Sequence, residues 1–314
     1  MNGDRGLLYI FPASMRKLWE HAAGQAENIQ EIRLRRDRPV IIRRHGGEIF
    51  LKSDGSFTVH DREARVAKGE ELEEILNYIC HYSIYAFEDE LRKGFLTVPG
   101  GHRIGVAGQA VLETAETVRN LKHISYMNIR VAHQIRGAAD KILPSLYERG
   151  KLCSTLIISP PGCGKTTMLR DIIRQASDGN AYGKGVTVGV VDERSEIAGS
   201  FMGVAQNDVG MRTDVLDGCP KVCGMMMLIR SMAPEIIAVD ELGGEEDRTA
   251  LRKVSSCGCR LLATVHGESL QELLEKEDMK KILQDGLFER YMILEKRSGV
   301  PAVRGVFGKE YQPC

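Results

Sequence analysis

The sequence lacks any apolar run long enough to cross a membrane, and it has no excess of charge of either sign. No part of its 314 residues approaches the roughly 18 consecutive apolar residues of a membrane span. The first residues do not have the form of a signal peptide. The 43 basic and 43 acidic side chains leave a formal net charge of zero, so we expect no nucleic-acid partner. Any membrane role would be peripheral, through a partner.

The cysteines also lack an arrangement typical of a metal site. The chain has eight of them, and Cys163 lies inside a glycine-rich loop, which suits a reducing compartment. Cys219 and Cys223, together with Cys257 and Cys259, could in principle supply four thiolates. Neither pair has the usual two-residue spacing, so the pattern favours small core residues.

The most informative stretch is residues 154–167. It begins with an apolar, β-branched run at residues 155–158, as expected for a buried strand. Gly162 and Gly164 follow, and they allow backbone N–H groups to turn inward around phosphate oxygens. A helical pattern then begins, and its N-terminus adds partial positive charge. Strand, glycine loop and helix in this order predict a phosphate-binding loop rather than a turn that binds nothing.

The loop residues predict how ATP and Mg²⁺ bind. Lys165 can reach the β- and γ-phosphates, and the Thr166 hydroxyl can bind Mg²⁺. The full motif has glycine five residues before Gly164, where this chain has Ser159, so we expect a slightly altered loop. The residues expected to contact the nucleotide are Ser159, Pro160, Pro161, Gly162, Cys163, Gly164, Lys165, Thr166 and Thr167.

Two domains are expected. The pattern of residues 1–135 predicts a smaller α+β domain that has no set of catalytic residues of its own. Its expected helices are residues 13–28 and 70–78, and its expected strands are residues 29–34, 39–43, 48–51, 95–98, 103–106 and 126–131. Residues 136–314 alternate strands with helices, which predicts an α/β, RecA-like P-loop NTPase domain with a mostly parallel sheet.

The elements of the second domain follow from its apolar runs. One helix is expected at residues 138–147, and another begins directly after the phosphate loop. Further helices are expected at residues 225–231, at residues 247–254 and from residue 269. Strands are expected at residues 155–158, 186–191, 236–239, 260–265, 291–294 and 303–307.

Polar groups follow several of these strands at the carboxyl ends, where ligands bind in parallel sheets. Asp240 and Glu241 follow an apolar strand, which is a Walker B arrangement. Asp240 would bind Mg²⁺ and Glu241 would polarise the attacking water. Such pairs also cap helices, but downstream of a phosphate loop they favour catalysis. Glu193 is a second carboxylate at a neighbouring strand end, either a base or the partner of Arg194.

A histidine and several arginines complete the predicted site. His266 either senses the γ-phosphate or caps the following helix. Arg194, Arg212 and Arg230 are candidates for compensating charge in phosphoryl transfer. The sequence decides neither which arginine acts nor whether Glu193 or Glu241 is the main base. The candidate catalytic residues are Lys165, Glu193, Arg212, Arg230, Glu241 and His266.

Together these motifs resemble the ATPases of type II and type IV secretion and pilus systems. The acidic box, the Walker B strand preceded by Pro-Glu and the Ala-Thr-x-His box correspond to residues 191–194, 230–241 and 263–266. The chain departs from that pattern because Asp240 stands where glycine is usual. The resemblance implies a ring whose sites are completed by arginines from a neighbouring subunit or from the N-terminal domain, where Arg130 is a candidate.

Four further stretches, residues 31–35, 100–105, 192–199 and 212–220, resemble the stage III sporulation protein AA family. This resemblance covers nearly the whole chain. It implies a hexameric, cytoplasmic ATPase on the mother-cell face of the forespore channel, attached to membrane-embedded channel components of the sporulation complex. A nucleotide-gated scaffold with little hydrolysis and a motor stimulated by nucleic acid are the alternatives on the same fold.

Overall fold

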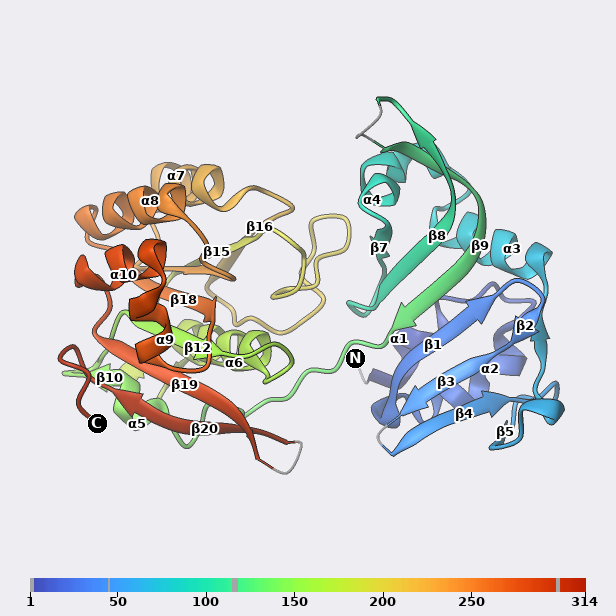
Figure 1. The fold of residues 1–314 in the computed structure, drawn as a ribbon, viewed down its shortest axis with the longest axis horizontal. Coiled ribbons are helices and arrows are strands. Elements are labelled where there is room, and N and C mark those ends of the chain that lie inside the picture. The colour runs from blue at the N-terminus through green and yellow to red at the C-terminus, as the bar shows by residue number, and fades with distance from the viewer. Residues whose placement is uncertain (1–2, 45, 115–117, 298–299) are drawn as a thin grey trace. The chain divides into compact units, whose positions relative to one another are not determined.

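The computed structural model describes residues 3–44, 46–114, 118–297 and 300–314, and the chain forms two compact units. The first unit contains the residues up to His133 together with the segment 199–206. The second contains residues 134–198 and 207–314, and each unit is built on its own sheet (Figure 1). Nothing in the sequence pattern marks residues 199–206 as part of the first unit.

The first unit contains an antiparallel sheet in the order β5-β4-β3-β1-β9-β8-β7. Its strands are β1 (Ile29–Arg35), β3 (Ile41–Arg44), β4 (Gly47–Leu51), β5 (Phe57–Thr58), β7 (Phe95–Thr97), β8 (Arg103–Leu112) and β9 (Val118–Arg130). Buried and accessible residues alternate along β1, so one face carries the core and the other is polar. In that core the rings of Phe11 and Trp19 stack with their centroids 4.1 Å apart.

Short helices and a small ribbon complete this unit. The helices are α1 (Gly3–Leu8), α2 (Arg16–Ala23), α3 (Gly69–Ile79) and α4 (Glu88–Arg92), with 3₁₀ turns at Ala26–Asn28, Asp61–Glu63 and Ile84–Phe87. The ribbon pairs β2 (Arg38–Pro39) with β6 (Val66–Ala67). Helix α3 buries Leu72, Ile75 and Ile79 on one side, as its apolar spacing predicts.

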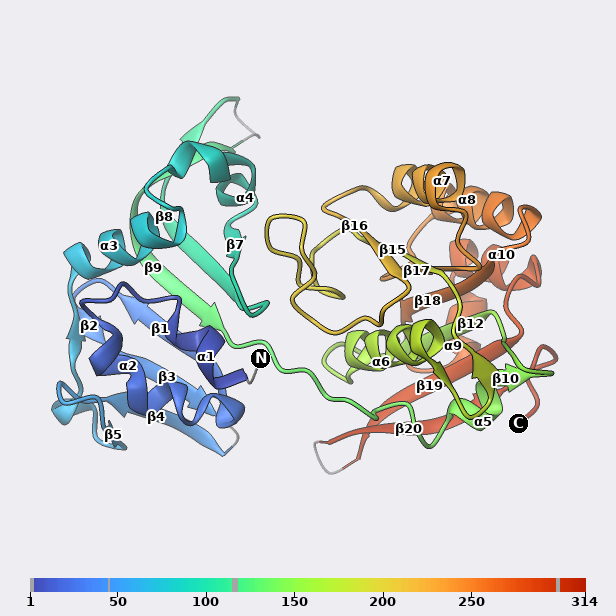
Figure 2. The ribbon, with the colours of Figure 1, turned by 180° about the vertical axis from the view of Figure 1, so that it is seen from behind.

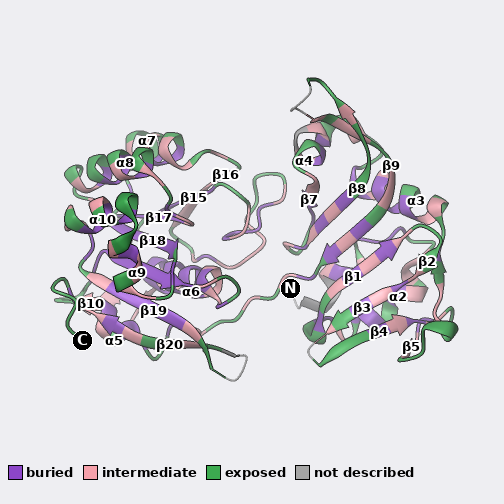
Figure 3. Ribbon diagram, in the orientation of Figure 1, coloured by how far each residue is buried: buried purple, intermediate pink, exposed green. Residues whose placement is uncertain are grey.

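The second unit contains a sheet in the order β16-β15-β17-β18-β12-β19-β20, in which β20 alone runs antiparallel to its neighbour. Its strands are β12 (Thr155–Ser159), β15 (Val188–Asp192), β16 (Thr213–Asp217), β17 (Ile236–Val239), β18 (Arg260–His266), β19 (Arg290–Arg297) and β20 (Val300–Phe307). Strands β12, β15 and β17 are buried along their whole length (Figure 3). Continuous apolar runs are expected where helices cover both faces of a parallel sheet.

Helices cover the two faces of this sheet unequally. Helices α7, α8, α9 and α10 pack on one face, and α6 lies on the opposite face, toward the viewer in Figure 2. The helices are α5 (Leu143–Leu146), α6 (Lys165–Asp178), α7 (Lys221–Met232), α8 (Glu245–Ser256), α9 (Leu270–Glu275) and α10 (Glu277–Gln284). Two short ribbons pair β10 (Tyr147–Glu148) with β11 (Lys151–Leu152) and β13 (Gly179–Asn180) with β14 (Gly183–Lys184).

The predicted α/β class with a mostly parallel sheet is confirmed, but several local details differ. The helix expected at residues 138–147 is wrong, because only Leu143–Leu146 is helical. Pro144 is tolerated only in the first turn of a helix, so a helix that contains it has to begin beside it. The apolar pattern also does not predict β16, whose residues are all partly accessible at the edge of the sheet.

No helix among the described residues is both long enough and apolar enough to span a bilayer.

Candidate functional site

The order of the strands brings the predicted motifs to one edge of the sheet. Strand β18 lies between β12 and β17, with Ser159 paired to His266 and Val239 paired to Ala263. Because all three strands are parallel, their carboxyl ends meet at the same edge. His266, the last residue of β18, therefore falls between the phosphate loop and Asp240.

The phosphate loop has the backbone geometry that its glycines predict. Gly162 and Gly164 have φ angles of 69° and 81°, in the left-handed region that glycine adopts without strain. Helix α6 begins at Lys165 and has no side-chain cap, so its first N–H groups are available to an anion. The Ser159 hydroxyl donates a hydrogen bond to the Pro160 carbonyl at 2.8 Å, which satisfies the serine at the altered position of the motif.

The terminal hairpin approaches this loop closely. A Cβ added at Gly162 would lie 3.3 Å from Lys296 Nζ, and one at Gly164 would lie 3.2 Å from Cβ of Pro301. Lys296 therefore adds a second cation beside the loop. The sequence gives no signal for it, because it is separated from the loop by more than a hundred residues.

Oxygen ligands suited to Mg²⁺ lie directly beside the loop. The Thr166 hydroxyl donates to Asp240 Oδ2 at 3.1 Å, and the Thr264 hydroxyl donates to Asp240 Oδ1. A hydroxyl and a carboxylate fit Mg²⁺, which usually takes one or two protein ligands and completes its shell with phosphate and water. The described residues contain no group of three or more His, Cys, Asp or Glu side chains that could hold a metal ion.

A continuous set of polar contacts joins the loop to the Walker B glutamate. Lys165 Nζ lies 3.0 and 3.2 Å from the two ring nitrogens of His266. His266 Nε2 lies 2.8 Å from Glu241 Oε1, and Arg194 Nη1 lies 2.9 Å from Glu241 Oε2. The capping alternative for His266 is wrong, because Ser269 Oγ accepts the N–H of Glu272 at the start of α9.

These contacts set the charge of Glu241. Burial raises the pKa of its carboxyl group, but the hydrogen bond from His266 and the positive charge of Arg194 outweigh burial and hold the pKa below its ordinary value of 4.5. Glu241 is therefore ionised at neutral pH, and it can accept a hydrogen bond from a water molecule.

Glu193 lies apart from this set. Its side chain is 43% exposed, and its Oε2 is 3.9 Å from Lys221 Nζ. The alternative in which Glu193 pairs with Arg194 is wrong, since Arg194 contacts Glu241 instead. Lys221 is a residue that sequence reasoning missed, because a single lysine directly after the signature stretch 212–220 carries no motif.

The other two candidate arginines lie far from the phosphate loop of their own chain. Arg212 Nη1 donates to the Ser177 carbonyl at 2.8 Å, at the far end of α6. At 1.5 Å per residue this point is about 18 Å along the helix from Lys165. Arg230 is exposed in the last turn of α7. Of the three arginines, Arg194 alone lies at the site within this chain, and roles for the other two in a neighbouring subunit stay predictions.

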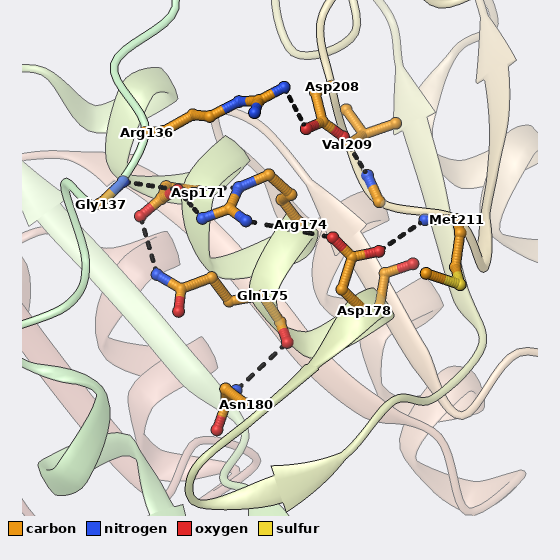
Figure 4. Close-up of polar contacts among 12 residues, drawn as sticks. Arg136, Gly137, Asp171, Arg174, Gln175, Asp178, Asn180, Asp208, Val209 and Met211 are labelled. Atoms are coloured by element: carbon orange, nitrogen blue, oxygen red, sulfur yellow. Dashed lines mark hydrogen bonds and ion pairs between the residues drawn. The ribbon is translucent and has the colours of Figure 1, made fainter.

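The outer face of α6 binds two further segments of the second unit (Figure 4). Asp171 is buried and accepts the N–H groups of Gly137 at 3.2 Å and Ala139 at 2.9 Å. Asp178 accepts the N–H of Met211 at 2.9 Å, while Arg174 lies 2.8 Å from Asp171 and 4.0 Å from Asp178. The helix that begins at the phosphate loop therefore fixes the first residues of this unit and the loop before β16.

The cysteines need a correction. Cys219 and Cys259 are only partly buried and Cys223 and Cys257 are exposed, so the prediction of small core residues is wrong, most clearly for Cys223 and Cys257. Cys223 lies on the solvent side of α7, and Cys257 lies at the C-terminal cap of α8. The apolar faces of both helices point to the sheet instead.

Solved structures define the class of fold. The chain is similar to the X-ray structure of the Legionella pneumophila ATPase DotB, with a TM-score of 0.60 and 16% identity over 95% of this chain and 81% of that chain. It is also similar to the pilus retraction motor PilT, solved with bound ADP, with a TM-score of 0.57 and 13% identity over 92% of this chain and 81% of that chain. The protein has the fold of the secretion and pilus ATPases.

The family follows from sequence comparison. The family model for sporulation stage III, protein AA matches residues 2–312. Stage III sporulation protein AA of Bacillus subtilis (strain 168) is 40% identical over 302 residues, which are 96% of this chain and 94% of that protein. The chain belongs to the stage III sporulation protein AA family, so the resemblance inferred from its signature stretches is confirmed.

Proposed function

We propose that this chain is an ATPase that hydrolyses ATP with Mg²⁺ at the carboxyl edge of its parallel sheet. The observation that carries the proposal is the contact of Lys165 with His266 and of His266 with Glu241, beside the pair Thr166 and Asp240. These contacts bring together a lysine that can bind phosphate, a pair of metal ligands and an ionised glutamate. Phosphoryl transfer to water requires all three.

Each residue has a role that follows from its position. Lys165 and the N–H groups at the start of α6 bind the phosphates. Thr166 and Asp240 would hold Mg²⁺, which when bound neutralises charge on the phosphate oxygens. Glu241 orients the attacking water, because its ionised carboxylate is linked to the loop lysine through His266. His266 contacts both Lys165 and Glu241, so it couples the binding of phosphate at Lys165 to the position of the Glu241 carboxylate.

The cellular task of this ATPase is proposed from the family. We infer that it powers or assembles a secretion-like channel at the forespore membrane and that it works as a hexameric ring in the mother-cell cytoplasm. Membership of the stage III sporulation protein AA family and the shared fold with DotB and PilT support this task. Its partners would be the membrane-embedded components of that channel.

The test is ATP turnover by the purified chain, with and without DNA, beside the variant Lys165→Ala. We expect steady turnover that DNA does not raise, and loss of ATP binding in the variant, because Lys165 supplies the loop's own positive side chain. Lys280→Ala, at an exposed position on α10, is the matched control and should leave both quantities unchanged.

Three outcomes would contradict the proposal. Turnover that rises with DNA would indicate a nucleic-acid motor. Tight ATP binding without turnover would indicate a nucleotide-gated scaffold. Unchanged ATP affinity in a folded Lys165→Ala variant would refute the phosphate-loop assignment.

A further inference from the structure

The turn that carries Glu241 has an unusual backbone conformation. Glu241 has a φ angle of 51°, in the left-handed region that a residue with a side chain rarely adopts. Its N–H donates to Asp240 Oδ1 at 3.0 Å and to Thr264 Oγ1 at 2.9 Å, and the N–H of Leu242 donates to the Thr264 carbonyl at 2.8 Å. Such a conformation persists only where surrounding contacts impose it.

Two charged side chains hold the other side of this turn. The ammonium group of Lys221 donates to the Glu241 carbonyl and lies 3.1 Å from Asp247 Oδ2. Asp247 also accepts the N–H of Gly243 at 2.8 Å. The side chains of Lys221 and Asp247 are only 15% and 9% exposed, so both contacts are shielded from competing water.

The position of Lys221 is not explained by the stability of its own helix. Lys221 is the first residue of α7, where the partial positive charge of the helix N-terminus disfavours a cation. Its charge is balanced from other elements, by Asp247 on α8 and by Glu193 after β15 at 3.9 Å. The contacts of Lys221 therefore serve the turn at Glu241.

We propose that Lys221, paired with Asp247, is a positioning residue for ATP hydrolysis. By holding the Glu241 carbonyl, Lys221 keeps the residue in its left-handed conformation, which directs the carboxylate to His266 beside the phosphate loop. Lys221 itself contacts neither Lys165 nor Thr166 among the described contacts, so it acts through Glu241. The inference rests on the proposed ATPase function of the same site.

The experiment compares Lys221→Met with the wild-type chain by ATP turnover and by the dissociation constant for ATP with Mg²⁺. Without the ammonium group, Glu241 can relax from its left-handed conformation, and its carboxylate moves away from the water it orients. We expect kcat to fall 10- to 100-fold, while the dissociation constant changes less than threefold. Lys221→Gln keeps a donor for the Glu241 carbonyl and should recover part of kcat.

The control is Lys253→Met on the exposed side of α8, which should match the wild type in both quantities. A kcat within twofold of the wild type in Lys221→Met would overturn the inference, as would a dissociation constant that rises as much as kcat falls. If Lys221→Met does not fold, Lys221→Gln is measured instead, and there we expect kcat to fall about three- to tenfold with an unchanged dissociation constant. A kcat equal to that of the wild type, or a dissociation constant that rises as much as kcat falls, would then overturn the inference. Wild-type protein without turnover would refute the proposed function instead, so the two failures are distinct.

Discussion

At the scale of single residues, two glutamates compete for the role of catalytic base. Glu241 contacts His266 and Arg194, whereas Glu193 is half exposed and faces Lys221 at 3.9 Å. The pKa of Glu241 is held below its ordinary value by His266 and Arg194, so in the proposed reaction we assign this carboxylate to orienting the water. The geometry favours Glu241, and the choice is open to a direct test.

Glu241→Gln should bind ATP with nearly wild-type affinity and hydrolyse it about 10² to 10⁴ times more slowly, because a neutral amide no longer orients the attacking water. Glu193→Gln is the matched variant and should lose far less activity. Single-turnover hydrolysis, measured beside ATP binding, separates the two. Greater loss of hydrolysis in Glu193→Gln would reverse the assignment.

At the scale of elements, α6 joins the proposed nucleotide site to the rest of the second unit. The helix begins at the phosphate loop, its buried Asp171 holds residues 137–139, and its last turn holds the loop at Met211 (Figure 4). Burial raises the pKa of Asp171, but hydrogen bonds from Ala139, Arg174 and Gln175 outweigh it and place the pKa below the ordinary 3.8. The ionised carboxylate therefore stabilises the folded state.

Asp171→Asn should lower the free energy of unfolding by about 1–3 kcal/mol at pH 7, because buried donors lose a charged acceptor. Because the pKa is depressed on folding, this stabilisation is complete above the unfolded-state pKa and is lost as the pH falls through the lower folded-state value. Urea unfolding is measured for both proteins at pH 7 and again below about pH 4. The difference in free energy of unfolding between the variant and the wild type should be smaller at the lower pH.

The control for this variant is Asp278→Asn, at an exposed position on α10, which should change the free energy of unfolding by less than about 0.5 kcal/mol. If Asp171→Asn is no more destabilising than this control, the contacts of Asp171 with residues 137–139 do not contribute to folding.

At the scale of the whole molecule, none of the three candidate arginines is free to contact a phosphate at the proposed site of its own chain. Charge that develops on a transferred phosphoryl group is usually stabilised by an arginine. Arg194 is committed to Glu241, whereas Arg212 and Arg230 are exposed and remote from Lys165 of the same chain. This arrangement motivates a ring in which a neighbouring subunit supplies the arginine.

If the sites lie between subunits, specific activity should rise with protein concentration, because isolated subunits lack the neighbour's arginine. Mixing Glu241→Gln subunits into wild-type protein should depress ATP turnover more steeply than the inactive fraction. The mixing series is measured at fixed total concentration. A strictly linear loss, together with activity independent of concentration, would show that each subunit works alone.

The sequence by itself determined the elements that depend on neighbours along the chain. The apolar runs of β12 and β17, the glycines of the phosphate loop and the acidic pair after β17 are local signals, because a strand or a turn depends on residues a few positions away. The same reasoning fails at residues 138–147, where Pro144 shortens the helix.

Only the tertiary structure decided which side chains meet. Arg194 contacts Glu241 rather than Glu193, Lys221 reaches the turn after β17, and Lys296 approaches Gly162. These contacts depend on the order of strands in the sheet, with β18 between β12 and β17, and on helices that arrive from distant parts of the chain. Strand order is set by the packing of the whole sheet and its covering helices, which no short stretch of sequence encodes.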